Sequence, residues 1–408
     1  MPGRARRFRE QKWLLDLVIS RVGLDWDLLR MGMATAPVGF EGMGDWSLVS
    51  TKAKRYDEIS PAFEEIAAGR EARAREAEAR GDEITARESY LVAALYYGIA
   101  QWPIDDVTER NLALNEKKVE CYGRYAKRAH HRIERVEIPL GRHVVPAWLH
   151  LPLVGEPPYP TVIMVPGMDN FKEALVWGYG DKMIERGLAA LTIDGPGQSE
   201  ALVRGLRITA DNFADVGHAC IGWIHQREDL DSDRVGVFGR SFGSYAATVL
   251  SNAISAHLRG TVVGLACFEP GFRTIFEEGS PSFKNRFMFM AGYEDEDAFD
   301  RFIAGFDLRT RVGNLRSPLM VLGGELDELA PFRCVFEVAK KVPGPVDIVA
   351  YQNERHAPGR APSSQAGPHW YAMMADWLAA RVRDRIPVER SRYRYIKANG
   401  EVEERPLP

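Results

Sequence analysis

The sequence predicts an α/β fold: a mostly parallel, doubly wound sheet of eight strands, preceded by a helical N-terminal domain. Short apolar segments alternate with helical patterns from about residue 134 onward. Apolar runs without strict polar alternation are typical of strands that are buried on both faces. The region before residue 134 shows helical periodicity alone. We therefore expect a helical domain over 1–133, a sheet domain over 134–387 and a short tail over 388–408.

The N-terminal region is expected to consist of helices. Charge pairs four residues apart cover 71–80, and apolar side chains recur at helical spacing over 84–99. The Trp-Pro pair at 102–103 ends this segment, and a second helix is expected over 104–129. A tetratricopeptide-like helix pair over 56–100 is the alternative arrangement, although no strong internal repeat is visible.

Eight apolar segments are expected to form the sheet. They are bounded by Gly, Pro, Asn and Asp, which favour turns. The predicted strands cover 135–140, 144–151, 160–165, 189–193, 234–238, 261–267, 317–322 and 346–351. In a parallel sheet of this kind, ligands bind beyond the carboxyl ends of the strands. The functional residues are therefore expected in the loops that follow the strands.

Two segments depart from this alternation of strands and helices. Residues 271–310 hold nine aromatic side chains, too many for a plain connection, which predicts a helical insertion over the carboxyl edge of the sheet. A helix pair that fills the core is the alternative. In the tail, Asn399 and Gly400 separate two alternating stretches, a pattern typical of a hairpin. We expect the tail to have little catalytic importance.

The composition argues against several classes of protein. With 45% hydrophobic residues and a net charge of -4 over 408 residues, the chain has no excess of basic residues that would bind nucleic acid. The four cysteines stand far apart without a C-x-x-C pair, which disfavours a zinc site and a disulfide framework. No apolar run has the length of a membrane span or of a signal-peptide core. We expect a cytoplasmic protein with no metal, no nucleic-acid partner and no membrane partner.

The stretch VGVFGRSFGSYAATVL, at 235–250, places Ser241 inside a G-x-S-x-G pattern. Glycine and serine are common residues, so the five-residue pattern alone is weak support. An apolar strand leads into the pattern and a helical pattern follows it, which is the strand-turn-helix context of a nucleophile elbow. A phosphate-binding loop is the rival, but the G-K-[ST] ending of such loops is missing. We therefore predict that Ser241 is a nucleophile.

A nucleophilic serine needs a general base, and the base needs an acid that orients it. His356 follows the last predicted strand in a loop, whereas His369 begins the final helix, so His356 is the preferred base. Asp327 lies just beyond the penultimate strand, and the chain order Ser, Asp, His is that of a hydrolase triad. Glu325 and Glu328 flank Asp327, and the alternative interpretation is a solvated acidic turn without a catalytic role.

Attack on a carbonyl also requires N–H donors for the developing oxyanion. The backbone N–H of Phe242, directly after Ser241, is one predicted donor. The loop VPGMDNFKEA after the third strand is expected to supply the other from Met168, next to Gly167; a simple strand-to-helix turn is the alternative. The turn LTIDGPGQSE is expected to be rigid, and its Asp194 precedes the serine in the chain, which indicates a structural role.

Five features stand in a fixed order along the chain: PGMDNFKE, DGPGQSE, GRSFGSYA, GGELDELAP and the late His356. In order and spacing they resemble the α/β hydrolases typified by 2,6-dihydroxypseudooxynicotine hydrolase, with the FrsA-like esterases as further relatives. The resemblance covers most of 135–387. It implies a helical cap, a homodimer, and Ser241, Asp327 and His356 as nucleophile, acid and base. It also implies cleavage of a carbon-carbon bond beside a ketone with help from a glutamate, for which Glu269 in CFEPGF is the candidate.

The preferred hypothesis is a serine hydrolase without a cofactor, which acts on a ketone or ester carbonyl of a small, partly aromatic substrate. Carbon-carbon hydrolysis and hydrolysis of an ester or lactone both stay open, because the same residues serve both reactions. A hydrolase fold that acts as a non-catalytic receptor is the alternative of another class. The N-terminal helices are expected to cover the mouth of the site; a dimerisation or stability module is the alternative for them.

Overall fold

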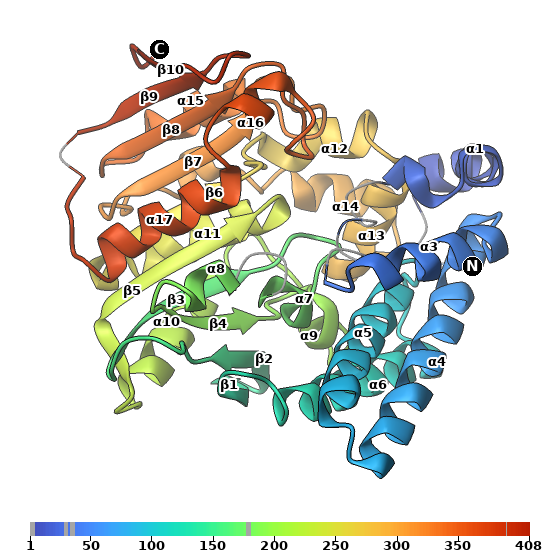
Figure 1. Cartoon of the computed structure of the whole chain (residues 1–408). Coiled ribbons are helices and arrows are strands. Elements are labelled where there is room, and N and C mark those ends of the chain that lie inside the picture. The colour runs from blue at the N-terminus through green and yellow to red at the C-terminus, as the bar shows by residue number, and fades with distance from the viewer. Residues whose placement is uncertain (1–4, 28–31, 33–36, 177–180, 389) are drawn as a thin grey trace.

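The structure of the chain is a computed structural model (Figure 1). It describes all residues other than 1–4, 28–31, 33–36, 177–180 and 389. Parts of the predicted N-terminal domain and one position of the predicted tail therefore lie outside the described residues. Among the helices in the described ranges, none is both long enough and apolar enough to cross a membrane.

The described strands form one sheet in the order β1-β2-β4-β3-β5-β6-β7-β8-β9-β10, which runs from bottom to top in Figure 1. Their bounds are β1 (Ile133–Leu140), β2 (His143–His150), β3 (Tyr159–Val165), β4 (Ala189–Ile193), β5 (Leu230–Arg240), β6 (Leu258–Gly264), β7 (Leu319–Gly324), β8 (Val346–Tyr351), β9 (Arg392–Ile396) and β10 (Val402–Arg405). The pairs from β4 through β9 are parallel, whereas β1 with β2, β2 with β4 and β9 with β10 are antiparallel. The predicted α/β fold with a mostly parallel sheet is confirmed.

Over the residues that the structure describes, the sheet has ten strands and not the predicted eight, because the tail adds two. Strand β9 pairs in parallel with β8, so that Ile396 lies opposite Tyr351, and β10 folds back on β9 across Asn399 and Gly400. Ile396 is fully buried. The tail therefore covers an edge of β8 whose backbone groups would otherwise be open to pairing with another chain. Alternation in the tail predicted the hairpin, but it carried no information on where the hairpin would pack.

The described part of the region before β1 is helical, with α1 (Arg6–Val22), α3 (Phe40–Lys52), α4 (Ile59–Arg80), α5 (Glu83–Gln101) and α6 (Glu109–Ala126). Helix α4 ends at Gly81, whose φ of 78° is the left-handed conformation that favours glycine. Helix α6 begins at Thr108, whose hydroxyl accepts a hydrogen bond from the backbone N–H of Asn111. Helices α5 and α6 lie beside α7 and α9 at the β1 side of the sheet (Figure 1).

Helices cover both faces of the sheet. Their bounds are α7 (Lys172–Leu175), α8 (Asp181–Ile184), α9 (Ser199–Val203), α10 (Phe213–His225), α11 (Phe242–Ala253), α15 (Arg333–Ala339), α16 (Pro362–Ala366) and α17 (Trp370–Val382). On one face side chains of α8 and α17 belong to the core that includes Val162 and Met164 of β3. On the other face α10 and α11 belong to the core that includes Ile163 and Val165. Successive residues of β3 thus point to opposite faces, as expected for a strand buried on both.

The aromatic segment 271–310 forms three α-helices, α12 (Arg273–Glu277), α13 (Pro281–Ala291) and α14 (Glu296–Ile303). Phe287 packs against Phe299 and Phe306, with ring centroids 6.1 and 5.7 Å apart, and all three side chains are at most 1% exposed. Part of the segment therefore fills a core of its own, and this packing gives the helices a fixed position beside the carboxyl edge of the sheet.

Candidate active site

Ser241 lies at the sharp turn between β5 and α11. Its backbone has a φ of 54° and a ψ of -129°, a combination that residues other than glycine rarely adopt. Glycines on both sides permit the turn. A Cβ on Gly239 would lie 2.2 Å from the carbonyl oxygen of Gly243, and a Cβ on Gly243 would lie 2.5 Å from that of Pro166. The local sequence therefore places the Ser241 hydroxyl at the carboxyl end of β5.

A continuous chain of hydrogen bonds connects Ser241 with His356 and Asp327. Ser241 Oγ lies 3.0 Å from Nε2 of His356. Nδ1 of the same ring lies 2.9 and 3.0 Å from the two carboxylate oxygens of Asp327. The His356 residue is 3% exposed and the Asp327 residue 7%. The structure thus brings together the three residues that sequence order selected, from the loops after β5, β7 and β8.

Backbone donors fix the two loops that carry the acid and the base. Asp327 Oδ1 accepts hydrogen bonds from the N–H groups of Leu329 and Ala330, at 3.0 and 2.7 Å. The flanking acids also have partners: Glu328 accepts from the N–H of His356 at 3.0 Å, and Glu325 accepts from the hydroxyl of Tyr395 at 2.9 Å. The acidic turn is therefore held in place by hydrogen bonds. His369, the alternative base, begins α17 and lines a different groove.

The two predicted oxyanion donors lie next to Ser241. Phe242 is the first residue of α11, directly after the serine. Met168 follows Gly167, where a Cβ would lie 3.5 Å from the Cβ of Ser241. Both Phe242 and Met168 line the same cavity as Ser241 and His356. Their roles as donors stay predictions, but the structure brings both residues to the serine.

Glu269 lies in a different environment from the one expected for a residue that orients a substrate. Its carboxylate accepts hydrogen bonds from the backbone N–H and the hydroxyl of Thr274, at 2.7 and 3.1 Å. These contacts hold the start of α12, and Arg333 lies 4.0 Å away on the other side. The residues that line the Ser241 cavity do not include Glu269. A role in catalysis stays a prediction for this residue.

A cavity of about 70 Å³ opens above Ser241. Its walls are mainly apolar and aromatic, with a small polar part, and comprise Gly167, Met168, Asp169, Asn170, Leu175, Arg240, Ser241, Phe242, Phe272, Ile275, Phe276, Phe283, Phe287, Leu329 and His356. The segment 271–310 supplies five of these side chains. It therefore faces the cavity with one side and packs as a core with the other, so both interpretations of its aromatic residues describe part of it.

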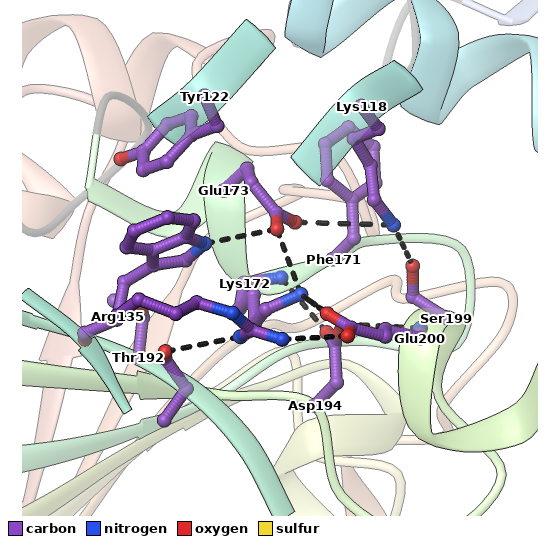
Figure 2. A network of polar contacts seen from close by, with 12 residues as sticks. Lys118, Tyr122, Arg135, Phe171, Lys172, Glu173, Thr192, Asp194, Ser199 and Glu200 are labelled. Atoms are coloured by element: carbon purple, nitrogen blue, oxygen red, sulfur yellow. Dashed lines mark hydrogen bonds and ion pairs between the residues drawn. The ribbon is translucent and has the colours of Figure 1, made fainter. Parts of the chain in front are cut away.

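A second group of polar side chains lies between the helical region and the sheet (Figure 2). We call it the ion cluster, and its members are Lys118, Arg135, Lys172, Glu173, Asp194 and Glu200. Lys172 Nζ lies 3.0 Å from Asp194 and 2.6 Å from Glu200, and it also lies 2.7 Å from Glu173. Arg135 contributes a further ion pair to Glu200 at 2.5 Å. The ion cluster joins the loop after β3 to the turn after β4.

Lys118 connects α6 to this group. Its Nζ donates a hydrogen bond to Ser199 Oγ at 2.5 Å, lies 3.9 Å from Glu173, and lies 5.2 Å from the ring centroid of Phe171. The side chain is fully buried. Trp148 of β2 donates a hydrogen bond to Glu173 at 2.9 Å from the opposite side. Side chains from the helical region and from the sheet thus meet at one buried site.

Burial and charge act in opposite directions on the groups of the ion cluster. Burial lowers the pKa of Lys172, but the carboxylates of Asp194, Glu173 and Glu200 raise it further, so the net pKa lies above the usual value. Burial raises the pKa of Glu173, yet Lys172 and Lys118 lower it to about 2. For Asp194 and Lys118 burial dominates: the pKa of Asp194 is raised and that of Lys118 is lowered.

Within the described residues, no group of three or more His, Cys, Asp or Glu side chains has the arrangement of a metal site.

The model of the family described as "Esterase FrsA-like" matches residues 65–290, which is more than half of the chain.

The chain belongs to the FrsA-like esterase family.

Two curated proteins that are similar to this FrsA-like chain are named as a hydrolase and an esterase. It is 28% identical over 296 residues to the 2,6-dihydropseudooxynicotine hydrolase of Paenarthrobacter nicotinovorans, a match that spans 71% of this chain and 76% of that protein. It is 30% identical over 192 residues to the esterase FrsA of Enterobacter sp. (strain 638), with 45% of this chain and 42% of that protein covered. The match therefore spans less than half the length of that esterase. The chain is an α/β hydrolase.

Solved structures share the fold of this FrsA-like protein. The crystal structure of the 2,6-dihydroxy-pseudo-oxynicotine hydrolase matches with a TM-score of 0.74 at 24% sequence identity, over 88% of this chain and 97% of that chain. AbyA5 matches with a TM-score of 0.58 at 19% identity, over 78% of this chain and 87% of that chain. At these identities the structural matches establish the fold alone.

Sequence reasoning missed most of the ion cluster of this FrsA-like protein. Lys172 and Glu173 stand inside PGMDNFKE, and Asp194 and Glu200 stand inside DGPGQSE. One signal could have found them: each of these short loops follows a buried strand, one loop carries a lysine, and both carry carboxylates. Charges at such positions are buried only when they are paired. Lys118 gave no signal, since nothing in an amphipathic helix shows which lysine is buried.

Proposed function

We propose that this FrsA-like protein is a serine hydrolase that attacks an activated carbonyl of a small, partly aromatic substrate. In this proposal Ser241 is the nucleophile, His356 is the general base and Asp327 is the acid that orients the base. The observation that carries the proposal is the hydrogen-bond chain from Asp327 through His356 to Ser241, which ends at an aromatic cavity.

The reaction would begin when His356 Nε2 accepts the proton of Ser241 as Oγ bonds to the carbonyl carbon. The N–H groups of Phe242 and Met168 would hold the negative oxygen of the tetrahedral intermediate. Collapse of the intermediate breaks the bond to the leaving group, which receives the proton from His356. A water molecule then hydrolyses the acyl-enzyme by the same steps, with His356 again as base.

The cavity supports a compact substrate with an apolar or aromatic part. Its walls hold four phenylalanines from the segment 271–310, and Asp169, Asn170 and Arg240 form the polar part of the lining. Carbon-carbon hydrolysis beside a ketone requires a leaving carbanion that the substrate itself stabilises, whereas an ester or lactone leaves as an alkoxide. Carbon-carbon hydrolysis is the preferred reaction, on the likeness to the Paenarthrobacter hydrolase; ester or lactone hydrolysis is the second candidate, on the family match.

A fluorophosphonate probe tests the nucleophile. The wild-type protein should be labelled, S241A should not, and S20A, which changes an exposed serine on α1, should be labelled like the wild type. Folded wild-type protein that stays unlabelled would instead support the rival function, a non-catalytic receptor with a hydrolase fold.

A paired substrate screen separates the two reactions. Aryl ketones and β-diketones are assayed beside aryl esters with wild type and E269Q. Loss of ketone cleavage with retained ester hydrolysis in E269Q would support carbon-carbon cleavage assisted by Glu269. Equal activity of both proteins on both substrate types would remove Glu269 from the mechanism.

We further propose that the N-terminal helices cap the catalytic domain and that the protein is a cytoplasmic homodimer. The cap proposal is supported by Lys118 of α6, which reaches the loop after β3 through the ion cluster. Deletion of residues 1–130 should change substrate preference or solubility, and an unchanged preference in a soluble product would overturn it. Sedimentation equilibrium tests the dimer, since a single species at the mass of one chain would contradict it.

A further inference from the structure

We propose that the turn at 194–200 is a clamp that sets the position of the predicted oxyanion donor, and that Gln198 and Asp194 are its positioning residues. We call this turn the clamp turn, and the segment 166–172, which contains Met168, the donor loop. The inference rests on the proposed function, because the donor loop has a catalytic meaning only if an oxyanion forms beside it.

Gln198 holds the first residue of the donor loop. Its Nε2 donates a hydrogen bond to the carbonyl oxygen of Pro166 at 2.6 Å. Its Oε1 accepts a hydrogen bond from the backbone N–H of Gly195 at 2.9 Å, within the clamp turn itself. The side chain is fully buried. Both ends of the amide are therefore engaged, and its orientation is fixed.

The carbonyl of Pro166 is confined from a second direction. A Cβ on Gly243, two residues beyond the nucleophile, would lie 2.5 Å from this carbonyl oxygen. The peptide that follows Pro166 thus lies between the Gln198 amide and the first turn of α11. Because Met168 comes two residues later, rotation of this peptide would change the direction of the Met168 N–H relative to Ser241.

Asp194 holds the last residue of the donor loop. Its Oδ1 accepts a hydrogen bond from the backbone N–H of Lys172 at 2.9 Å, and its Oδ2 lies 3.0 Å from Nζ of the same residue. Oδ2 also accepts from the N–H of Glu200 at 3.2 Å, which ties Asp194 to the far end of the clamp turn. The two ends of the donor loop are therefore held by two side chains of a single turn (Figure 2 shows the Asp194 end).

This arrangement explains the order of residues in DGPGQSE. The aspartate and the glutamine hold backbone groups at the two ends of the donor loop, and Glu200 adds an ion pair to the Lys172 side chain at 2.6 Å. A Cβ on Gly195, between the aspartate and the glutamine, would lie 2.4 Å from the ring of Phe213. The clamp turn can therefore lie this close to Phe213 of α10 only with glycine at this position. A positioning role of this kind acts on the transition state, because an oxyanion donor stabilises charge that is absent from the bound substrate.

Substitution of Gln198 tests the inference. Q198M removes both hydrogen bonds of the amide at similar volume, and Q198E keeps the acceptor for Gly195 but loses the donor to Pro166. Both variants should lower kcat by about 10- to 100-fold with KM within about twofold, since loss of one oxyanion donor costs about 100- to 1000-fold and a misplaced one costs less. Q226E, which changes the exposed C-cap residue of α10, is the matched control and should keep the wild-type kcat.

Inhibition by an aryl trifluoromethyl ketone separates positioning from general loss of structure. This ketone forms a hemiketal with an active serine and places a negative oxygen against the donors. Its inhibition constant should rise in Q198M and Q198E by the same factor by which kcat falls, with a melting temperature that shows folded protein. Should Q198M unfold, Q198E decides alone.

Three outcomes would overturn the clamp. They are a wild-type kcat in Q198E, a loss that appears in KM only, or a lower kcat with unchanged inhibition by the ketone. Failure of the proposed function looks different, because the wild type itself would then be neither labelled by the fluorophosphonate nor inhibited by the ketone.

Discussion

Two polar groups lie on different loops at the carboxyl ends of the parallel strands, and they differ in composition and charge. Ser241, His356 and Asp327 form a linear chain with one carboxylate, and one end faces a cavity. The ion cluster contains three cations and three carboxylates held by short ion pairs, and Arg204 adds a further ion pair to Glu200 at 2.9 Å.

The difference is consistent with the proposed function. In the proposed reaction Ser241 and His356 pass a proton back and forth, so the histidine would gain and then lose charge during each turnover. A buried ion cluster gives fixed geometry only while its charges stay, because removal of one partner leaves another charge unpaired. The two groups are therefore expected to respond to mutation through different observables, activity for one and stability for the other.

The largest expected effect is on activity, in S241A. Loss of the nucleophile should lower kcat by about 10⁶-fold, by analogy with other serine hydrolases, because the remaining donors and cavity supply only part of the rate enhancement. The free energy of unfolding, measured with urea, should stay within about 1 kcal/mol of the wild-type value. Residual turnover within about tenfold of wild type would show that another residue attacks the substrate.

The second effect is on stability, in K172M. This substitution leaves Asp194, Glu200 and Glu173 without their central cation, and removal of one partner from a buried ion pair typically costs about 3–5 kcal/mol. Urea denaturation measures the loss. K341M, which changes an exposed lysine, should stay within about 0.5 kcal/mol of wild type. Equal free energies of unfolding for K172M and K341M would mean that the ion cluster does not stabilise the fold.

The third effect is a dependence of stability on pH that arises outside both groups. His131 and His150 contact each other at 2.9 Å, and burial lowers the pKa of His131 to about 4 and that of His150 well below its usual value. The folded protein keeps these rings neutral, whereas the unfolded chain binds protons below about pH 6.5. Their contribution to stability is therefore present above about pH 6.5 and is lost as the pH falls toward about 4.

Urea unfolding between about pH 7 and about pH 5 measures this loss. H131Q keeps a hydrogen-bonding side chain without this titration, so its stability should fall less over the same range. Glu173, with a pKa of about 2, keeps its charge throughout. Wild-type stability that rises as the pH falls over this range, or an equal fall in H131Q, would contradict the assignment to the histidine pair.

The smallest effect is expected in the tail. Y395F removes the hydrogen bond from the Tyr395 hydroxyl to Glu325, at a cost of about 1 kcal/mol. The kcat should stay within about twofold of wild type, because Asp327 has its own backbone donors. Y393F, on the same strand, is the matched control. A fall in kcat of tenfold in Y395F alone would show that the tail supports the acid loop.

Local patterns predicted the parts of the molecule that local chemistry determines. Each of the eight predicted strands is an apolar run between turn formers, and the turn at Ser241 depends on its neighbouring glycines. Asp327 and His356 could be selected because strand order fixes which loops meet at the carboxyl edge.

Contacts between distant elements could not be predicted in this way. The ion cluster needs α6, β1 and two loops at one point, and no short window of sequence contains that information. The same holds for β9, whose alternating residues fit any free sheet edge, and for Glu269, whose partner Thr274 depends on where α12 begins. Backbone donors such as the Met168 N–H have no residue signature at all, since every non-proline residue carries one.

The backbone of Ser241 has a consequence for the evolution of the chain. A φ of 54° is unfavourable for serine by about 1–3 kcal/mol, and glycine adopts it without that penalty. A lineage released from selection for turnover would therefore gain stability by replacing this one residue with glycine, and it would gain nothing similar at Asp327 or His356. Among descendants that have lost activity, we expect glycine to replace Ser241 first, while Asp327 and His356 are retained.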